Sequence, residues 1–265
     1  MTSRLAVAAA AALVLLPCAA SAADTEKKDL LITIGPGAQF APAYPGADKL
    51  RLGPMPVFDW RKEGDPLTFE AADEGIGMGF LGSKSAVDFG PAVQFQGKRR
   101  ESDVGALVGK VGFTVEAGGF LQVYAGRNLR FRVEGRKGLG GHKALVGDVS
   151  ADLLSGDPER MRTIFSIGPR LRLADSRYNR TYFGVTPAVA VKTGLAAYRP
   201  SGGIRAVGVM AGVDHRFNDS WGVTAYAGYD RLVGDAADSP IVRSYGSRSQ
   251  PSVGLGLSYT FRVRR

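Results

Sequence analysis

Residues 221–232 read WGVTAYAGYDRL, and this stretch decides the fold. Successive side chains of a β-strand point to opposite faces, so the odd and even positions separate. One face carries Trp221, Val223, Ala225, Ala227 and Tyr229, and the other carries Gly222, Thr224, Tyr226, Gly228 and Asp230. An apolar face of this length with an aromatic residue at each end is typical of a strand that crosses a membrane. We predict that this face contacts lipid.

The same two-residue period recurs along the chain, for example in residues 129–136, 162–173 and 251–263. A helix would scatter these alternating residues around its surface, so the pattern predicts strands. The strands of a soluble β-sandwich would also alternate apolar and polar residues. The strands are long, however, and their polar faces are charged, which leaves few large side chains for a central core. The pattern therefore predicts an all-β protein, a closed antiparallel up-and-down transmembrane β-barrel.

We predict about twelve strands, with ten to fourteen possible because residues 66–72 and 75–81 alternate only weakly. The predicted strands are 29–41, 51–61, 66–72, 75–81, 85–96, 117–125, 129–138, 143–153, 162–173, 203–216, 221–232 and 251–263. Short polar turns such as 126–128 and 218–220 alternate with longer connections at 97–116, 174–202 and 233–250. In outer-membrane barrels the short turns and both termini face the periplasm, and the long loops face outward.

The N-terminus predicts export. Arg4 precedes an apolar run over residues 5–16, Pro17 ends the run, and small residues follow, as in a secretory signal peptide. We expect cleavage after Ala22, or one residue later, so that residues 1–22 are the signal and residues 23–265 form the barrel. Cys18 is the only cysteine; a lipid anchor there would require a small residue in place of Pro17, so we expect Cys18 to leave with the signal.

The net charge of +9 could suggest nucleic acid as a partner, but the export signal and the even spread of the charges argue against it. We expect no enzyme, cofactor or metal site. The chain has two histidines, and His215 and Asp214 are adjacent in a predicted strand, so they point to opposite faces. We expect His142 and His215 to be ordinary solvated side chains. The segment that contains Asp235 and Asp238 lacks the regularly spaced oxygen ligands of a calcium-binding loop.

Charged side chains fall on the predicted inward faces. They are Arg130, Arg132, Glu134, Arg136, Arg162, Arg170, Arg172, Arg205, Asp59, Asp88 and Asp230. One interpretation is a paired network that fills the lumen, because an unpaired charge in a confined space is costly. The other is a narrow water-filled channel for small anionic solutes. We favour the network, because about twelve strands leave only modest room inside.

Several segments resemble the MipA/OmpV family of outer-membrane proteins over nearly all of the mature chain. The matching segments are 42–47 (PAYPGA), 182–186 (YFGVT) with Gly194 and Tyr198, 231–242 (RLVGDAADSPIV), and Gly256 with Tyr259 and Phe261. Tyr259 and Phe261 also resemble the C-terminal signal that the barrel assembly machinery recognises, although four residues follow Phe261. The resemblance implies a scaffold in the outer-membrane lipid that brings a murein lytic transglycosylase and a murein synthase together.

Overall fold

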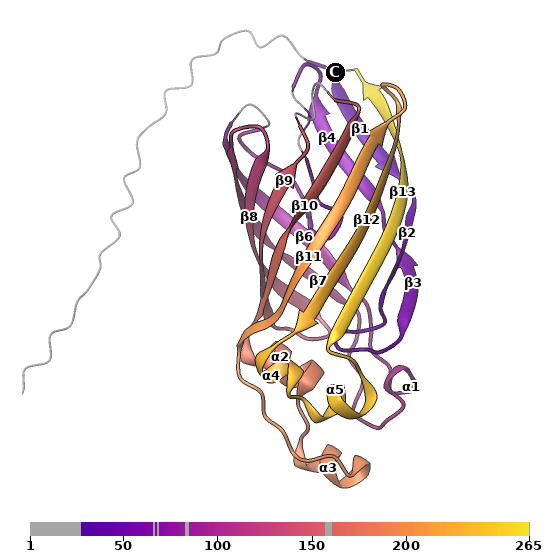
Figure 1. Cartoon of the computed structure of the whole chain (residues 1–265), viewed down its shortest axis with the longest axis vertical. Helices are drawn as coiled ribbons and strands as arrows, with labels where there is room; N and C mark the ends of the chain where they lie inside the picture. Colours follow the sequence, from indigo (N-terminus) through magenta and orange to yellow (C-terminus); the bar gives the residue numbers. More distant parts are fainter. Residues whose placement is uncertain (1–27, 66, 68, 83–84, 157–160, 265) are drawn as a thin grey trace, which may run out of the picture.

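The computed structural model describes residues 28–65, 67, 69–82, 85–156 and 161–264. The predicted signal peptide, including Cys18, lies outside these residues. Within the described residues, thirteen strands form one antiparallel sheet that curls into a barrel (Figure 1). The strands are β1 (Leu30–Gly35), β2 (Gly37–Pro42), β3 (Leu50–Pro54), β4 (Val57–Lys62), β5 (Ile76–Gly77), β6 (Val87–Gln96), β7 (Thr114–Ala125), β8 (Leu129–Gly140), β9 (Leu145–Leu154), β10 (Thr163–Ala174), β11 (Gly203–Arg216), β12 (Trp221–Leu232) and β13 (Ser249–Val263).

From β5 to β13, each strand pairs with the next one along the chain, and the sheet then continues to the N-terminal strands. The predicted antiparallel barrel is thus confirmed. β13 pairs with both β1 and β2, so strands from opposite ends of the chain lie side by side in the sheet. Leu30 lies opposite Val263, which places the start of β1 and the end of β13 at the same end of the barrel. We call this the termini end.

Two of the predicted N-terminal strands are interrupted. Residues 29–41 divide into β1 and β2 around Pro36, and residues 51–61 divide into β3 and β4 around Met55 and Pro56. Proline has no N–H to donate to the ladder, which explains the breaks. The prediction for 75–81 reduces to β5, continued by bonds from the Met78 and Phe80 N–H groups to β6. The prediction of a strand over 66–72 is wrong, since its described residues form no strand.

Burial along the strands is the reverse of that in a soluble protein. In β8, Phe131 and Val133 are 46% and 51% exposed, whereas Arg130 and Arg132, which alternate with them, are 0% and 2% exposed. Other strands follow this pattern, with apolar side chains outward and charged ones inward. An apolar outer surface is stable only against an apolar medium, so the barrel wall is suited to lipid. None of the described helices is long and apolar enough to cross a membrane.

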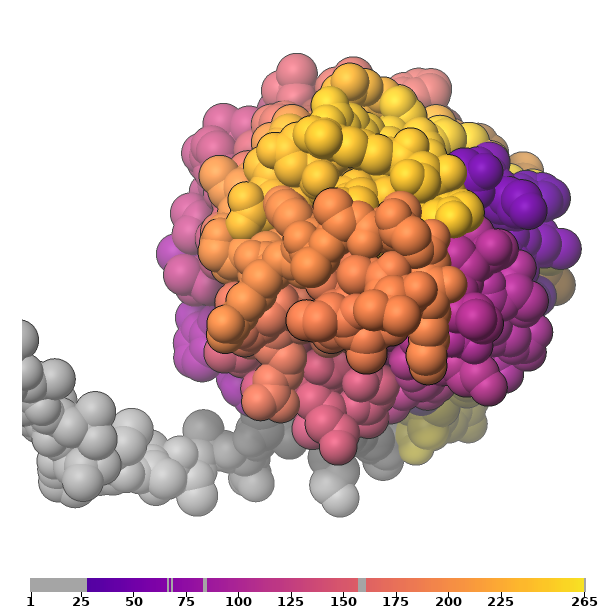
Figure 2. All heavy atoms as spheres, turned by 90° about the horizontal axis from the view of Figure 1, so that it is seen from below, coloured from indigo at the N-terminus to yellow at the C-terminus, as the bar shows by residue number. Residues whose placement is uncertain are grey.

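Among the described residues, five short helices in the long connections cover the end opposite the termini (Figure 1). They are α1 (Glu101–Val104), α2 (Ser176–Phe183), α3 (Pro187–Thr193), α4 (Gly234–Ala237) and α5 (Pro240–Tyr245). Side chains at the helix starts accept backbone N–H groups: Asp175 begins α2, Thr186 begins α3 and Ser239 begins α5. Figure 2 shows this end covered by the connections that carry the helices. We call these connections the cap.

Candidate functional site

The connection after β4 passes through the inside of the barrel and meets inward-facing arginines. Arg130 of β8 donates to the Glu74 carboxylate at 2.5 Å, the Asp152 carboxylate at 2.8 Å and the Phe69 carbonyl at 3.0 Å. The Arg130 guanidinium also lies 4.8 Å from the centre of the Phe69 ring. Because Phe69 and Glu74 do not belong to the wall, these bonds hold residues 69–75 within the lumen. We call residues 69–75 the plug.

A second set of arginines extends the network. Arg170 of β10 bridges Asp152 at 2.8 Å and Asp73 of the plug at 2.9 Å. Arg172 binds Asp73 at 2.5 Å and Asp230 at 3.2 Å. Charged hydrogen bonds of this kind are stronger than neutral ones, and here they connect strands β8, β9, β10 and β12 through the plug.

A third set continues the network toward the cap. Arg136 binds Glu116, Glu134 and Asp148, and Arg132 binds Glu134 at 2.6 Å. The cavity left among these charges measures about 10 Å³, which is close to the minimum for a single water molecule. Side chains therefore fill the lumen at this level.

The structure brings together Arg130, Arg132, Glu134, Arg136, Arg170, Arg172 and Asp230 of the predicted inward charges. Four others lie elsewhere. Asp88 accepts the Leu81 N–H, the Arg205 guanidinium lies 5.1 Å from the centre of the Tyr178 ring, and Asp59 and Arg162 line a separate cavity at the termini end. Sequence reasoning missed the plug carboxylates of Asp73 and Glu74, because their segment was predicted as loop between two weak strands.

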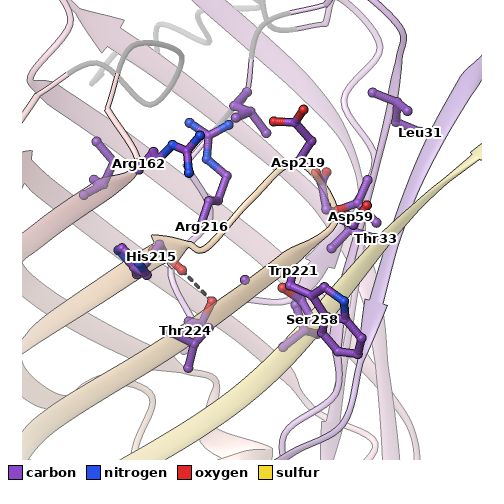
Figure 3. Close-up of a pocket in the computed structure, with 18 of the residues that line it drawn as sticks. Leu31, Thr33, Asp59, Arg162, His215, Arg216, Asp219, Trp221, Thr224 and Ser258 are labelled. Atoms are coloured by element: carbon purple, nitrogen blue, oxygen red, sulfur yellow. Dashed lines mark hydrogen bonds between the residues drawn. The ribbon is translucent and has the colours of Figure 1, made fainter.

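The separate cavity opens at the termini end and has a volume of about 400 Å³. We call it the basin. Figure 3 shows Arg162 and Arg216 directed toward one another on one side, with Thr33 and Asp59 on another side. Phe69 of the plug and Ile164 of β10, both buried, belong to its apolar lining. This volume and mixed lining are in the range of sites that bind ligands or segments of partners.

Three arginines of the basin donate to backbone carbonyls. Arg162 donates to the Phe217 carbonyl at 2.8 Å, Arg216 to the Met161 carbonyl at 2.9 Å, and Arg61 to the Asp65 carbonyl at 3.3 Å. A carbonyl fixes a guanidinium without neutralising its charge. The basin lining also includes the carboxylates of Asp59, Glu70, Asp214 and Asp219, so it presents charges of both signs.

His142 lies in the core of the cap. It is 2% exposed, its Nε2 lies 3.0 Å from a Glu116 carboxylate oxygen, and its Nδ1 accepts the Ala144 N–H at 3.1 Å. The prediction of a solvated His142 is therefore wrong, because α2 covers the turn and places Tyr178 against the imidazole. Burial raises the pKa of Tyr178 to about 12, so this phenol stays neutral at physiological pH.

The other residues considered for catalysis or metal binding have ordinary partners. His215 Nδ1 lies 2.7 Å from the Thr163 hydroxyl, and Asp214 accepts from the Thr224 hydroxyl at 2.5 Å (dashed line in Figure 3). Asp235 accepts from Ser201, and Asp238 pairs with two arginines. Within the described ranges there is no group of three or more His, Cys, Asp or Glu side chains that could hold a metal ion.

Two solved outer-membrane β-barrels are among the structures similar to this chain. The N-terminal β-barrel domain of Pseudomonas aeruginosa OprF is 14% identical, with 66% of this chain and 96% of that chain covered and a TM-score of 0.27. The outer membrane protein OprG of Pseudomonas aeruginosa is 10% identical, with 89% and 97% covered and a TM-score of 0.26. No curated protein matches the chain.

A family model described as MltA-interacting protein MipA matches residues 34–261. The match begins in β1 and ends in β13, so it includes nearly all of the barrel and the whole of the plug and the cap. It confirms the family resemblance seen in the sequence. The chain is a β-barrel that belongs to the MipA family.

Proposed function

We propose that this protein is an outer-membrane scaffold that holds a murein-cleaving lytic transglycosylase and a murein synthase together at the periplasmic face. The apolar outer wall and the predicted signal peptide support the outer membrane as its location. The family description names an interaction with MltA, which supports the lytic transglycosylase as one partner.

The observation that carries the proposal is the filled lumen. Buried ion pairs join the plug to the wall, and the cap covers one end of the barrel (Figure 2). A channel needs a continuous wet path, and side chains fill this one at the level of Arg130 and Arg170. We therefore place the function on the exposed surfaces and not in transport through the barrel.

The orientation of the barrel in the membrane decides which exposed surface would bind the enzymes. Short turns, such as the one between β7 and β8, lie with the termini, and the helical connections lie at the other end (Figure 1). By the usual plan of outer-membrane barrels, the termini end then faces the periplasm, where murein lies. The basin and the turns beside it would meet the enzymes.

Two experiments test the proposal. Membrane fractionation with heat-modifiable gel mobility should place the mature chain in the outer membrane as a folded barrel. Detergent extracts should then yield it together with a lytic transglycosylase and a murein synthase. Steady anion-selective currents from the refolded protein in planar bilayers, with no enzyme co-purifying, would replace the scaffold with the channel.

A further inference from the structure

Lys137 of β8 lies on the lipid-facing side of the barrel wall, near the cap. It is exposed, and its neighbours on that side are apolar: Ala117 opposite it in β7, Leu145 opposite it in β9, and Leu139 two residues further along β8. Leu139 and Leu145 are both more than half exposed. A cation on the lipid side of a barrel is costly unless its long side chain carries the ammonium to a polar partner at the membrane surface. Lys137 is therefore placed to meet such a partner at the cap end of the wall.

Lys143 adds a second ammonium beside Lys137. It is exposed and lies two residues before Leu145, in the short turn that joins β8 to β9. The Gly138 N–H binds the Ala144 carbonyl at 2.8 Å, which closes this turn against the end of β8. The two lysines thus flank the exposed leucines at the cap end of the wall.

The helix α2 supplies two guanidinium groups to the same region. Asp175, which begins α2, accepts the Leu145 N–H at 3.0 Å, so the start of the helix lies against β9. Arg177 is exposed in the first turn. Arg180 is also exposed, and it donates to the Ser176 hydroxyl at 2.9 Å, which brings its guanidinium back to the start of the helix. We give the name basic cluster to Lys137, Lys143, Arg177 and Arg180.

One carboxylate, that of Asp175, lies among these four cations. Burial raises the pKa of Asp175, whereas backbone N–H groups and the Lys137 ammonium lower it, which indicates that Lys137 lies near this carboxylate. Asp175 already accepts two backbone N–H groups. In the described part of the chain, each salt bridge involves cations outside the basic cluster. Asp235, elsewhere in the cap, accepts from the N–H and hydroxyl of Ser201. The basic cluster therefore keeps a net positive charge.

The helix dipole adds to this positive charge. The N-terminus of a helix carries a partial positive charge, so cations placed there are unfavourable and anions are favourable. The first turn of α2 contains no acidic residue, and Arg180 reaches back to Ser176 at this end of the helix. A phosphate group has several oxygens that accept from ammonium and guanidinium groups, and it would offset the charge of both the side chains and the dipole.

We propose that the basic cluster and the exposed leucines beside it bind a phosphorylated lipid of the outer leaflet. The phosphate oxygens accept from the lysines and arginines of the basic cluster, and the acyl chains lie along Leu139 and Leu145 on the wall. The inference rests on the orientation of the barrel proposed above, with the cap outward. It is independent of the scaffold function, because the basin lies at the other end.

The position of Lys137 favours a lipid over a soluble anion. Apolar side chains surround Lys137 on the wall, and basic residues beside a membrane-spanning surface recognise anionic headgroups. A lipid covers Leu139 and Leu145 with its acyl chains while its phosphates meet the cations. A soluble anion would satisfy the charges and leave these leucines without a partner.

The test uses native mass spectrometry of the refolded mature chain in detergent micelles. The probes are diphosphoryl lipid A and the same lipid A with both phosphates removed. We expect the diphosphoryl form to bind at least tenfold more tightly, and less tightly as salt is added. Equal binding of the two lipids would overturn the proposal. Displacement of the bound lipid by excess inorganic phosphate would assign the basic cluster to soluble anions and overturn it as well.

Matched variants locate the binding. Lys137→Gln should weaken binding of diphosphoryl lipid A about fivefold, and Lys137→Arg should stay within about twofold, because it keeps the charge. Lys192→Gln is the control, since Lys192 is exposed on α3, which lies farthest from the strands (Figure 1). Heat-modifiable mobility verifies that each variant is folded, and Lys143→Gln replaces Lys137→Gln if the latter does not fold. Equal binding by the glutamine variants of the basic cluster and of Lys192 would overturn the proposal.

Two further experiments separate this inference from the scaffold function. Cys18 is the only cysteine and lies in the predicted signal, so a Lys192→Cys variant should react with a membrane-impermeant maleimide on intact cells. Reaction only after the outer membrane is permeabilised would place the cap in the periplasm and overturn the inference. Murein enzymes should co-purify equally with the wild type and Lys137→Gln. Failure of all capture, with the preference for diphosphoryl lipid A intact, would reject the scaffold and support the lipid site.

Discussion

Substitution of Arg130 by methionine should destabilise the barrel strongly. The Arg130 side chain is fully buried and contacts Glu74, Asp152 and the Phe69 carbonyl. Removing one partner of a buried ion pair costs roughly 3–5 kcal/mol, because the remaining charge stays buried. Here Asp152 keeps Arg170 at 2.8 Å, and Glu74 keeps Arg132 at 3.7 Å. We therefore expect the lower end, a loss of about 3 kcal/mol in the free energy of unfolding.

The assay is equilibrium unfolding by guanidinium of the refolded chain in micelles, followed by tryptophan fluorescence and by gel mobility. Arg162→Met is the control, since Arg162 is exposed and donates to a carbonyl; it should cost no more than about 1 kcal/mol. Adding Asp152→Asn to Arg130→Met should recover part of the loss by removing a buried charge. If Arg130→Met costs as little as Arg162→Met, the network does not hold the plug.

Three further predictions concern the cap and assembly. Burial raises the pKa of Asp175, but hydrogen bonds from the Leu145 and Tyr178 N–H groups lower it more, so its folded pKa lies below the usual 3.8. Asp175→Ala should therefore cost about 1 kcal/mol at pH 7, in unfolding measured against pH, and less as the pH falls through that lowered pKa. Arg99 is 2% exposed and donates to the Tyr182 carbonyl at 2.8 Å, so Arg99→Met should speed proteolysis of the cap while gel mobility still reports a folded barrel. Phe261→Ala should slow assembly into membranes in pulse-chase experiments, and Val263→Ala should not.

The alternation of side chains was sufficient to predict the strands from β6 to β13. In these strands each side chain faces either lipid or the lumen, so its polarity alone indicates which face it occupies. It was insufficient where one residue interrupts a ladder. Pro36 separates β1 from β2, yet both pair with β13, so the apolar pattern of residues 29–41 runs through the break. The alternation of side-chain polarity gives no information about a backbone N–H that proline lacks.

The plug illustrates a different limit. Asp73 meets Arg170 and Arg172, which are 97 and 99 residues away, and nothing in the local sequence specifies such partners. The alternation predicted that Arg170 and Arg172 point inward, but only the folded barrel shows which carboxylates reach them. The same holds for His142, whose Gly-Gly-His turn is covered by α2 from a distant connection.

These two limits bear directly on function. The inward arginines were open to two interpretations because each strand, read alone, presents an unpaired charge to the lumen. Once Asp73 and Glu74 enter from the connection after β4, the charges of Arg130, Arg170 and Arg172 are satisfied by the chain itself, and no solute is needed to neutralise them. The basin at the termini end instead has a lining of mixed charge, in which Arg61, Arg162 and Arg216 donate to backbone carbonyls and Asp59, Glu70, Asp214 and Asp219 supply carboxylates. Under the proposed scaffold function, the termini end is the surface that meets a partner, and the lumen charges hold the plug inside the barrel wall.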